Sequence, residues 1–213
     1  MLLFFIIKMK KLMFNYTIYL LTMEDLHKSL LERLKGVKSL VFIGIGEEKL
    51  SDDGVGPYII SELLEYSNER VLFINAGTDP MARIDDVVNF NPSYLILIDT
   101  CTLNKPPGTV AILERESIKE YVPISTHTIP VHIVIDLIVE KLTELNVFMI
   151  GFVPESLEGF QELKLYKQDE LTLEERSDNI DLPFFELSLT KTIKTEADKL
   201  IKIIKKLLTH FKV

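Results

Sequence analysis

Short apolar runs alternate along this chain with segments of helical spacing, and this alternation limits the fold more than any other feature. Such runs stand at 40–43, 71–74, 94–98, 109–113 and 147–153. The run Tyr94–Ile98 is continuous and apolar, which is typical of a strand buried on both faces. We therefore predict an α/β fold, a three-layer α/β/α sandwich around a mostly parallel, twisted sheet of about five strands.

One domain accounts for most of the chain, and we place it at residues 23–213. Amphipathic helices are predicted from Met23 to Gly36, from Val131 to Leu145 and from Thr195 to Phe211. Residues 161–187 are rich in charge and show no clear period, so we interpret them as a polar insertion.

The first 22 residues are strongly apolar, and three interpretations of them stay open. A signal peptide and a membrane anchor are two, but Lys8, Lys10 and Lys11 leave neither half long enough to span a bilayer. No small-residue cleavage site follows Leu21. We favour the third, an apolar extension upstream of a true start at Met23, untranslated or disordered. We accordingly expect no stable membrane insertion.

Composition excludes several classes of protein. The net charge of −8 argues against nucleic acid as a partner. A single cysteine, Cys101, excludes a disulfide framework and a cysteine-based metal cluster. This usage fits a reducing, cytoplasmic setting. The surface shows no obvious stripe for self-association, so we expect a monomer.

The densest group of polar candidates lies between residues 40 and 57. An apolar strand leads into Gly44-x-Gly46, the acids Asp52 and Asp53 follow, and Pro57 stands where a helix would start. A glycine loop at a helix start often binds phosphate, but two carboxylates would repel it. Carboxylates suit a cation or proton transfer instead. The simpler alternative is that Ser51 or Asp52 caps the helix and Asp53 complements its dipole.

Two further polar residues are expected at the same edge of the sheet. Asp99 ends the strand at 94–98, and His127 stands in a loop before the helix at 131. Ligands of open parallel sheets bind beyond the carboxyl ends of the strands. Asp53, Asp99 and His127 therefore form a plausible oxygen–oxygen–nitrogen set for Ni²⁺ or Zn²⁺, with open coordination positions.

Two rival catalytic sets are weaker. Cys101, Asp99 and His127 can be written as a cysteine-protease set, but Cys101 stands too close to Asp99 in sequence for both to converge on one imidazole. A buried thiol is the simpler interpretation. Asp52 and Asp53 as an aspartic-protease pair would have to share one proton, and adjacent residues near a helix start rarely face each other.

An ordered set of short motifs runs from about Leu40 to Glu158. Its members are Gly44-x-Gly46, Ser51–Pro57, Ala76–Thr78, Leu97–Asp99, Pro107–Thr109, Ser125–His127 and Gly151–Glu155. This set resembles, in order and rough spacing, the hydrogenase maturation endopeptidases, which trim the C-terminal tail from the large subunit of [NiFe] hydrogenases. No single motif is diagnostic, but the loop Thr126–Pro130 and the pair Asp79–Pro80 are most similar to the formate-hydrogenlyase-type branch.

The resemblance implies a phosphorylase/hydrolase-like α/β domain and a specific chemistry. It implies that Asp53, Asp99 and His127 are the nickel-contacting positions. Nickel would arrive in the hydrogenase large-subunit precursor, rather than be held permanently, and would serve to recognise a finished metal centre. Water would be activated either by that metal or by a carboxylate such as Asp52 or Asp53, so Asp53, Asp99 and Asp52 are the catalytic candidates.

Two departures from the family pattern bear on the substrate. Glu47 replaces the family's usual Asn, and Asn75 replaces the acid of its usual Asp–Gly–Gly–Thr. They keep open an alternative function, a nickel-checking chaperone that binds the large subunit without cutting it. A phosphate- or nucleotide-binding enzyme is a third class, which the acidic loop disfavours; we expect no nucleotide.

Overall fold

The computed structural model describes residues 18–122, 129–157 and 188–211. They form a mixed α/β domain around one six-stranded sheet of order β1-β5-β6-β4-β2-β3. The strands are β1 (Ile18–Leu21), β2 (Leu40–Ile45), β3 (Val71–Gly77), β4 (Tyr94–Thr100), β5 (Val110–Glu114) and β6 (Asn146–Phe152). The helices are α2 (Met23–Arg33), α3 (Val55–Ser61), α4 (Ile84–Phe90), α5 (Arg115–Tyr121), α6 (Val131–Lys141) and α9 (Lys191–Phe211), with 3-10 turns η1 (Ser51–Gly54), η2 (Leu64–Tyr66) and η3 (Pro80–Arg83).

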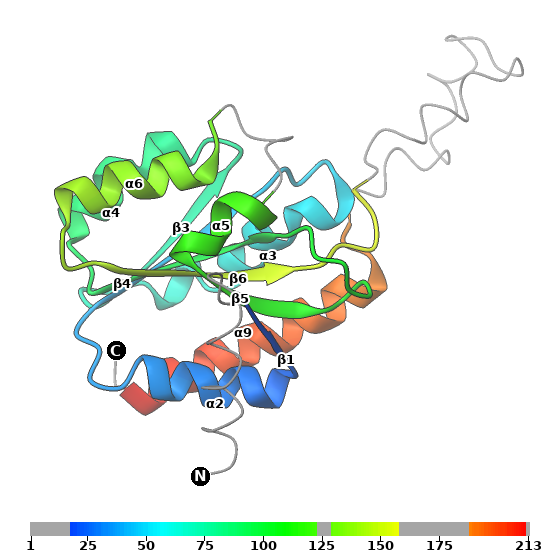
Figure 1. Ribbon diagram of the computed structural model, residues 1–213. Coiled ribbons are helices and arrows are strands. Elements are labelled where there is room, and N and C mark those ends of the chain that lie inside the picture. The colour runs from blue at the N-terminus through cyan, green and yellow to red at the C-terminus, as the bar shows by residue number, and fades with distance from the viewer. Residues whose placement is uncertain (1–17, 123–128, 158–187, 212–213) are drawn as a thin grey trace, which may run out of the picture.

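Helices cover both faces of the sheet, as the predicted sandwich requires (Figure 1). Alternate residues along each buried strand feed two separate apolar cores, because neighbouring side chains of a strand point to opposite faces. Phe42 and Ile96 pack with residues of α2, α3 and α9, whereas Ile43 and Leu97 pack with residues of α4 and α6. The three-layer architecture is confirmed.

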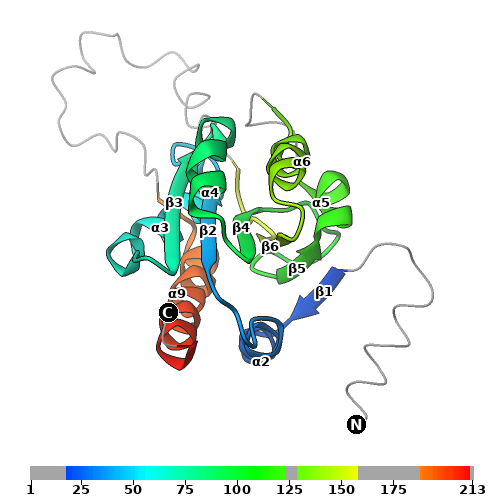
Figure 2. The same ribbon diagram turned by 90° about the vertical axis from the view of Figure 1, so that its left-hand side faces the viewer.

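Four strands, β3, β2, β4 and β6, are parallel to one another, and β5 and β1 extend the sheet with antiparallel pairs. Every residue of β2 is buried, which fits a strand covered on both faces. Seen from the side, β3 and β1 lie at opposite ends of the sheet (Figure 2). Parallel strands bring their carboxyl ends to one edge, and the candidate residues gather there.

The expectation that residues 1–22 lie outside the fold is wrong for residues 18–22. Ile18–Leu21 form β1, which pairs with β5 and gives the sheet one more strand than expected. Thr22 is the N-cap of α2, and its hydroxyl accepts a hydrogen bond from the Asp25 N–H. The sequence did not indicate this because apolar edge strands and anchors share a composition. Residues 1–17 and the insertion at 161–187 lie outside the described residues.

The helix at the C-terminus is longer than predicted but buries the expected face. It begins at Lys191, and its inward residues Leu200, Ile204 and Leu207 are almost fully buried against the sheet and α2. Among the described residues, no helix combines the length and apolarity needed to cross a membrane.

Candidate active site

Glycines allow α3 to start directly against the ends of two strands. A Cβ on Gly56 would lie 2.4 Å from the carbonyl oxygens of Ile45 and Ile98, which end β2 and approach the end of β4. Gly46 has φ 134°, and a Cβ there would lie 1.9 Å from the Asp53 carbonyl oxygen. These contacts leave no room for a side chain, so the loop after β2 folds back and buries Asp53 at the sheet edge.

The carboxylate of Asp53 is held at both oxygens. Its Oδ2 accepts a hydrogen bond from the Glu47 backbone N–H at 2.7 Å. Its Oδ1 accepts one from the Thr100 hydroxyl at 3.2 Å. The residue is 3 % exposed, and none of the ion pairs between described residues involves it. A buried carboxylate fixed in this way is suited to meet a cation or to take a proton.

Asp99 lies at the end of β4 beside the same hydroxyl. Its Oδ1 accepts a hydrogen bond from the Thr100 N–H at 2.6 Å and lies 3.5 Å from the Thr100 hydroxyl oxygen. Asp99 is 1 % exposed and Thr100 is 2 % exposed. One threonine therefore contacts both carboxylates, of which Asp53 lies in η1 and Asp99 in β4.

Sequence reasoning did not single out Thr100. Its position could have identified it as a candidate. Thr100 directly follows Asp99 at the end of a buried strand, where a hydroxyl needs a polar partner. A hydroxyl carries a single proton, so Thr100 donates to one carboxylate at a time. The shorter distance, to Asp53, identifies the preferred acceptor.

Asp52 has hydrogen-bond partners different from those of Asp53 and Asp99, and these partners give it a different task. It is fully buried and accepts hydrogen bonds from the backbone N–H groups of Glu155, Ser156 and Thr190 and from the Thr190 hydroxyl. These four hydrogen bonds occupy both carboxylate oxygens with donors from the protein itself. The expectation of Asp52 as a general base is therefore disfavoured, because its carboxylate anchors distant segments of the chain.

The helix-capping alternative is wrong for the same stretch. Neither η1 nor α3 has a side-chain hydrogen bond at its N-cap; those positions are Leu50 and Gly54. The helix starts at Val55, so Pro57 lies inside its first turn. Asp52 and Asp53 are buried by tertiary contacts and do not serve as local caps.

The third member of the predicted metal set, His127, lies outside the described residues. Within 18–122, 129–157 and 188–211, no three His, Cys, Asp or Glu side chains gather as a metal site. The described part of the set consists of two buried carboxylates, which suit a divalent cation as oxygen ligands. The set of Asp53, Asp99 and His127 stays a prediction.

Cys101 is fully buried in the apolar core that includes residues of α4, α5 and α6. Its thiol is fully buried, and a Cβ on Gly151 would lie 2.7 Å from its Sγ. Burial, with a smaller contribution from the charge of Asp99, raises the pKa of Cys101 to about 12. The thiol stays protonated at neutral pH, which disfavours the cysteine-protease alternative.

The two departures from the family pattern lie beside the site. The Glu47 side chain accepts a hydrogen bond from the Lys49 N–H at 3.0 Å, so it folds back onto its own loop. The Asn75 amide donates to Glu48 at 3.3 Å, while its oxygen accepts the Gly77 N–H at 3.1 Å. An acid at position 75 would face the Glu48 carboxylate, so an amide fits this loop better.

Comparison with known proteins defines the class and then the family. A family model described as hydrogenase maturation protease matches residues 57–168, a span that includes Asp99 and begins after Asp53. A protein of Methanocaldococcus jannaschii named as a hydrogenase maturation protease is 33% identical over 137 residues, which cover 61% of this chain and 80% of that protein. The hydrogenase 3 maturation protease of Escherichia coli is 25% identical over 115 residues, covering 54% and 72% of the two chains.

Solved structures agree on the fold. The crystal structure of HycI, a [NiFe] hydrogenase maturation protease from Thermococcus kodakarensis, superposes with a TM-score of 0.65 at 22% identity and covers 85% of this chain and 99% of its own. The protein is a peptidase. The chain belongs to the hydrogenase maturation protease family.

Proposed function

We propose that this peptidase removes the C-terminal extension of a [NiFe] hydrogenase large-subunit precursor after nickel has been inserted. In this proposal nickel belongs to the substrate, and Asp53, Asp99 and His127 recognise it. The observation that carries the proposal is the pair of buried carboxylates, Asp53 and Asp99, which approach one hydroxyl at the carboxyl edge of a parallel sheet. The family supplies the class of substrate.

The charge of the pair supports recognition of a cation. Burying a carboxylate away from water is costly unless hydrogen bonds or an opposite charge compensate it. Asp53 receives two hydrogen bonds but no ion pair from a described residue, so a divalent ion in the substrate would lower the cost of its burial. A precursor without metal would not offer this gain, and this difference would make cleavage wait for nickel.

Peptide hydrolysis needs a group that accepts a proton from water and later returns it to the leaving amine. Asp53 and Asp99 are the described candidates at the sheet edge, because Asp52 is occupied by its four hydrogen bonds. The Glu47 N–H and the Thr100 hydroxyl fix the orientation of the Asp53 carboxylate. A fixed carboxylate can accept a proton from a water molecule that is held in one position. Nickel in the precursor would supply Lewis-acid polarisation of the scissile carbonyl.

The test is the intact mass of a large-subunit precursor after incubation with the protein, with and without nickel loaded. We expect loss of a C-terminal peptide from the loaded precursor alone. Asp53→Asn and Asp99→Asn keep the side-chain shape, and each is expected to lower kcat by about a hundredfold or more. Asp85→Asn, which changes an exposed carboxylate on α4, is the matched control.

Two results would contradict the proposal. Cleavage of a nickel-free precursor at the full rate would remove nickel as the recognition element. Binding of the loaded precursor with no change in its mass would instead assign the chaperone function. In that case, reverting Glu47 and Asn75 to the family's usual residues would show whether these departures abolish cleavage.

A further inference from the structure

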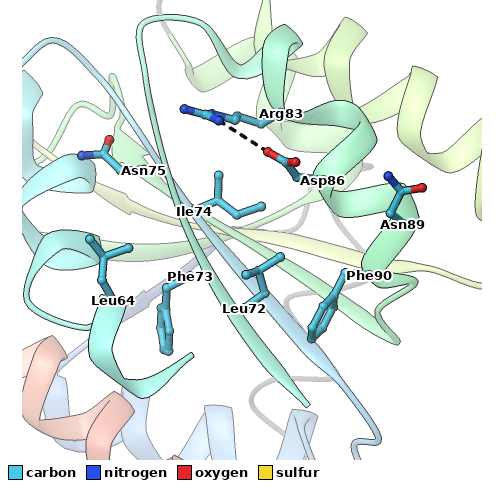
Figure 3. Close-up of a pocket in the computed structure, with 9 residues that line it drawn as sticks. All are labelled: Leu64, Leu72, Phe73, Ile74, Asn75, Arg83, Asp86, Asn89 and Phe90. Carbon is cyan, nitrogen blue, oxygen red and sulfur yellow. Dashed lines mark hydrogen bonds and ion pairs between the residues drawn. The ribbon is translucent and has the colours of Figure 1, made fainter. Parts of the chain in front are cut away.

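The outer edge of β3 lies in an open groove. The groove has a volume of about 600 Å³ and is lined from both sides of the strand, by η2 on one side and by η3 and α4 on the other (Figure 3). Because residues from both faces of β3 line it, the groove follows the strand edge itself. Its lining comprises Leu64, Leu72, Phe73, Ile74, Asn75, Arg83, Asp86, Asn89 and Phe90.

The amino half of this edge is already covered. Asn68 bonds the N–H and the carbonyl oxygen of Val71, at 3.1 and 2.7 Å, and the Ser67 hydroxyl accepts the Phe73 N–H at 3.2 Å. These contacts show that Val71 and Phe73 turn their backbone groups away from β2. Since direction alternates along a strand, the Asn75 N–H points the same way.

No described residue pairs with the carboxyl half of the edge, which we call its open half. The sheet places only β2 beside β3, and no residue within the described ranges bonds the Phe73 carbonyl oxygen or the Asn75 backbone N–H. An edge acceptor and an edge donor two residues apart are what an added strand pairs with. The Ser67 and Asn68 contacts limit this open part to a few residues of a partner.

The open half leads directly to the candidate active site. The Gly77 carbonyl, at the end of β3, accepts the Gly46 N–H at 3.0 Å. The next residue, Glu47, donates its N–H to Asp53 at 2.7 Å. A peptide paired with Asn75 would therefore have its adjacent residues, on the side of the carboxyl end of β3, beside the loop that carries Asp53.

The side chains around the groove favour an uncharged occupant. Arg83, which is positively charged and lines the groove, forms an ion pair with Asp86 at 3.5 Å. At the end of the groove nearer the candidate active site, the Asn75 amide contacts Glu48. Leu64 and Phe90 flank the strand with apolar surface, on opposite sides of it (Figure 3). Backbone pairing flanked by apolar side chains is the pattern by which proteins bind extended peptides.

We propose that the open half of the β3 edge binds the first residues of the precursor's C-terminal tail as an added antiparallel strand. This inference rests on the proposed function. The residues after the scissile bond leave the site at the carboxyl end of β3 and run back along it, so they are antiparallel to it. The tail's backbone accepts from the Asn75 N–H and donates to the Phe73 carbonyl, and its side chains contribute little beyond being uncharged.

A proline scan of the tail tests this pairing. Proline lacks the N–H, so we expect KM to rise about fivefold or more at alternate positions near the cut and less than about twofold at the positions between them. Alanine at each position is the matched control and should leave KM unchanged. Equal effects at neighbouring positions, or none, would overturn strand addition.

A substitution in the groove tests whether the tail binds there. Leu64 is 47% exposed on η2 and Leu20 is 45% exposed on β1, at the opposite end of the sheet. Leu64→Glu is expected to raise KM for the precursor about fivefold with kcat unchanged, because the bound tail would cover the new charge, and Leu20→Glu is expected to change neither. An unchanged KM in the Leu64 variant, or an equal rise in both, would overturn the proposed place.

The wild-type protein with the unmodified precursor separates this inference from the function on which it rests. If the precursor is cut and the scan shows no alternation, the function stands and strand addition fails. If the precursor is bound but not cut, the proposed cleavage fails, and the dissociation constants of the same precursor variants replace KM. Alternation in those constants would still support the strand, and its absence would overturn it.

Discussion

The Asp52 carboxylate accepts hydrogen bonds from the backbone N–H of Thr190 at 2.7 Å and from its hydroxyl at 3.1 Å, across 138 positions of sequence. The same carboxylate accepts the N–H groups of Glu155 and Ser156, both at 2.9 Å. One buried side chain thus fixes the loop after β2 to the segment after β6 and to the start of α9.

Asp52→Asn is expected to destabilise the whole domain by about 3 kcal/mol, because a neutral amide offers one acceptor to donors that bonded a charge. Chemical denaturation with an activity assay on the folded fraction measures this. Thr190→Val, which removes the hydroxyl alone, should cost about 1 kcal/mol. An Asp52→Asn protein with normal stability and no activity would show that Asp52 takes part in catalysis.

Thr100→Val is expected to lower kcat about tenfold with KM nearly unchanged, because Asp53 loses a donor that fixes its orientation. Thr100→Ser keeps the hydroxyl and should retain most of the activity. Steady-state kinetics on the nickel-loaded precursor give the answer. Equal losses in both variants would point to packing by the methyl group instead.

Gly56→Ala is expected to destabilise the protein by about 3 kcal/mol or more, because its Cβ would overlap two carbonyl oxygens at 2.4 Å and push α3 off the sheet. Gly77→Ala is the matched control: it has φ 52° but no atom within 4 Å of the added Cβ, so backbone strain of about 1 kcal/mol is the main cost. Thermal denaturation of both variants checks the difference. Equal losses would contradict the close-approach argument.

Cys101 is expected to resist alkylation in the native protein between pH 7 and about 9, because burial raises its pKa to about 12 and excludes reagent. In denaturant it should react like an ordinary thiol. Mass spectrometry after iodoacetamide treatment counts the modified fraction. Rapid modification of the folded protein would reopen the cysteine-protease interpretation.

A chain that begins at Met23 is expected to be less stable than one that begins at Ile18, by about 2 kcal/mol or more. It lacks β1 and the Thr22 cap of α2, and it exposes the edge of β5. Equilibrium denaturation and light scattering of the two chains measure stability and association. Identical behaviour would show that β1 adds nothing to the fold.

Much of the sheet could be predicted because its strands are buried on both faces. The run Tyr94–Ile98 carries that requirement in its composition, so the type of this element could be predicted directly. β1 could not be identified in the same way. It pairs on one side only and lies in an apolar stretch whose meaning depends on distant β5.

The candidate site shows a similar division. Asp53 and Asp99 were identifiable because each follows a strand whose carboxyl end must lie at the ligand edge. The task of Asp52 was not, because its partners lie more than a hundred positions away, at Glu155, Ser156 and Thr190. Thr100 was missed because its importance depends on two carboxylates whose closeness only the folded chain shows.

The partners of Asp52 have a consequence for the protein's biosynthesis. The nascent chain carries the Asp52–Asp53 pair early, but Thr190 is made 138 residues after Asp52. Until α9 is released from the ribosome, the Asp52 carboxylate lacks its partner there, and the loop that orients Asp53 is incompletely held. We therefore expect the geometry around Asp53 to be complete only after the start of α9 has been synthesised.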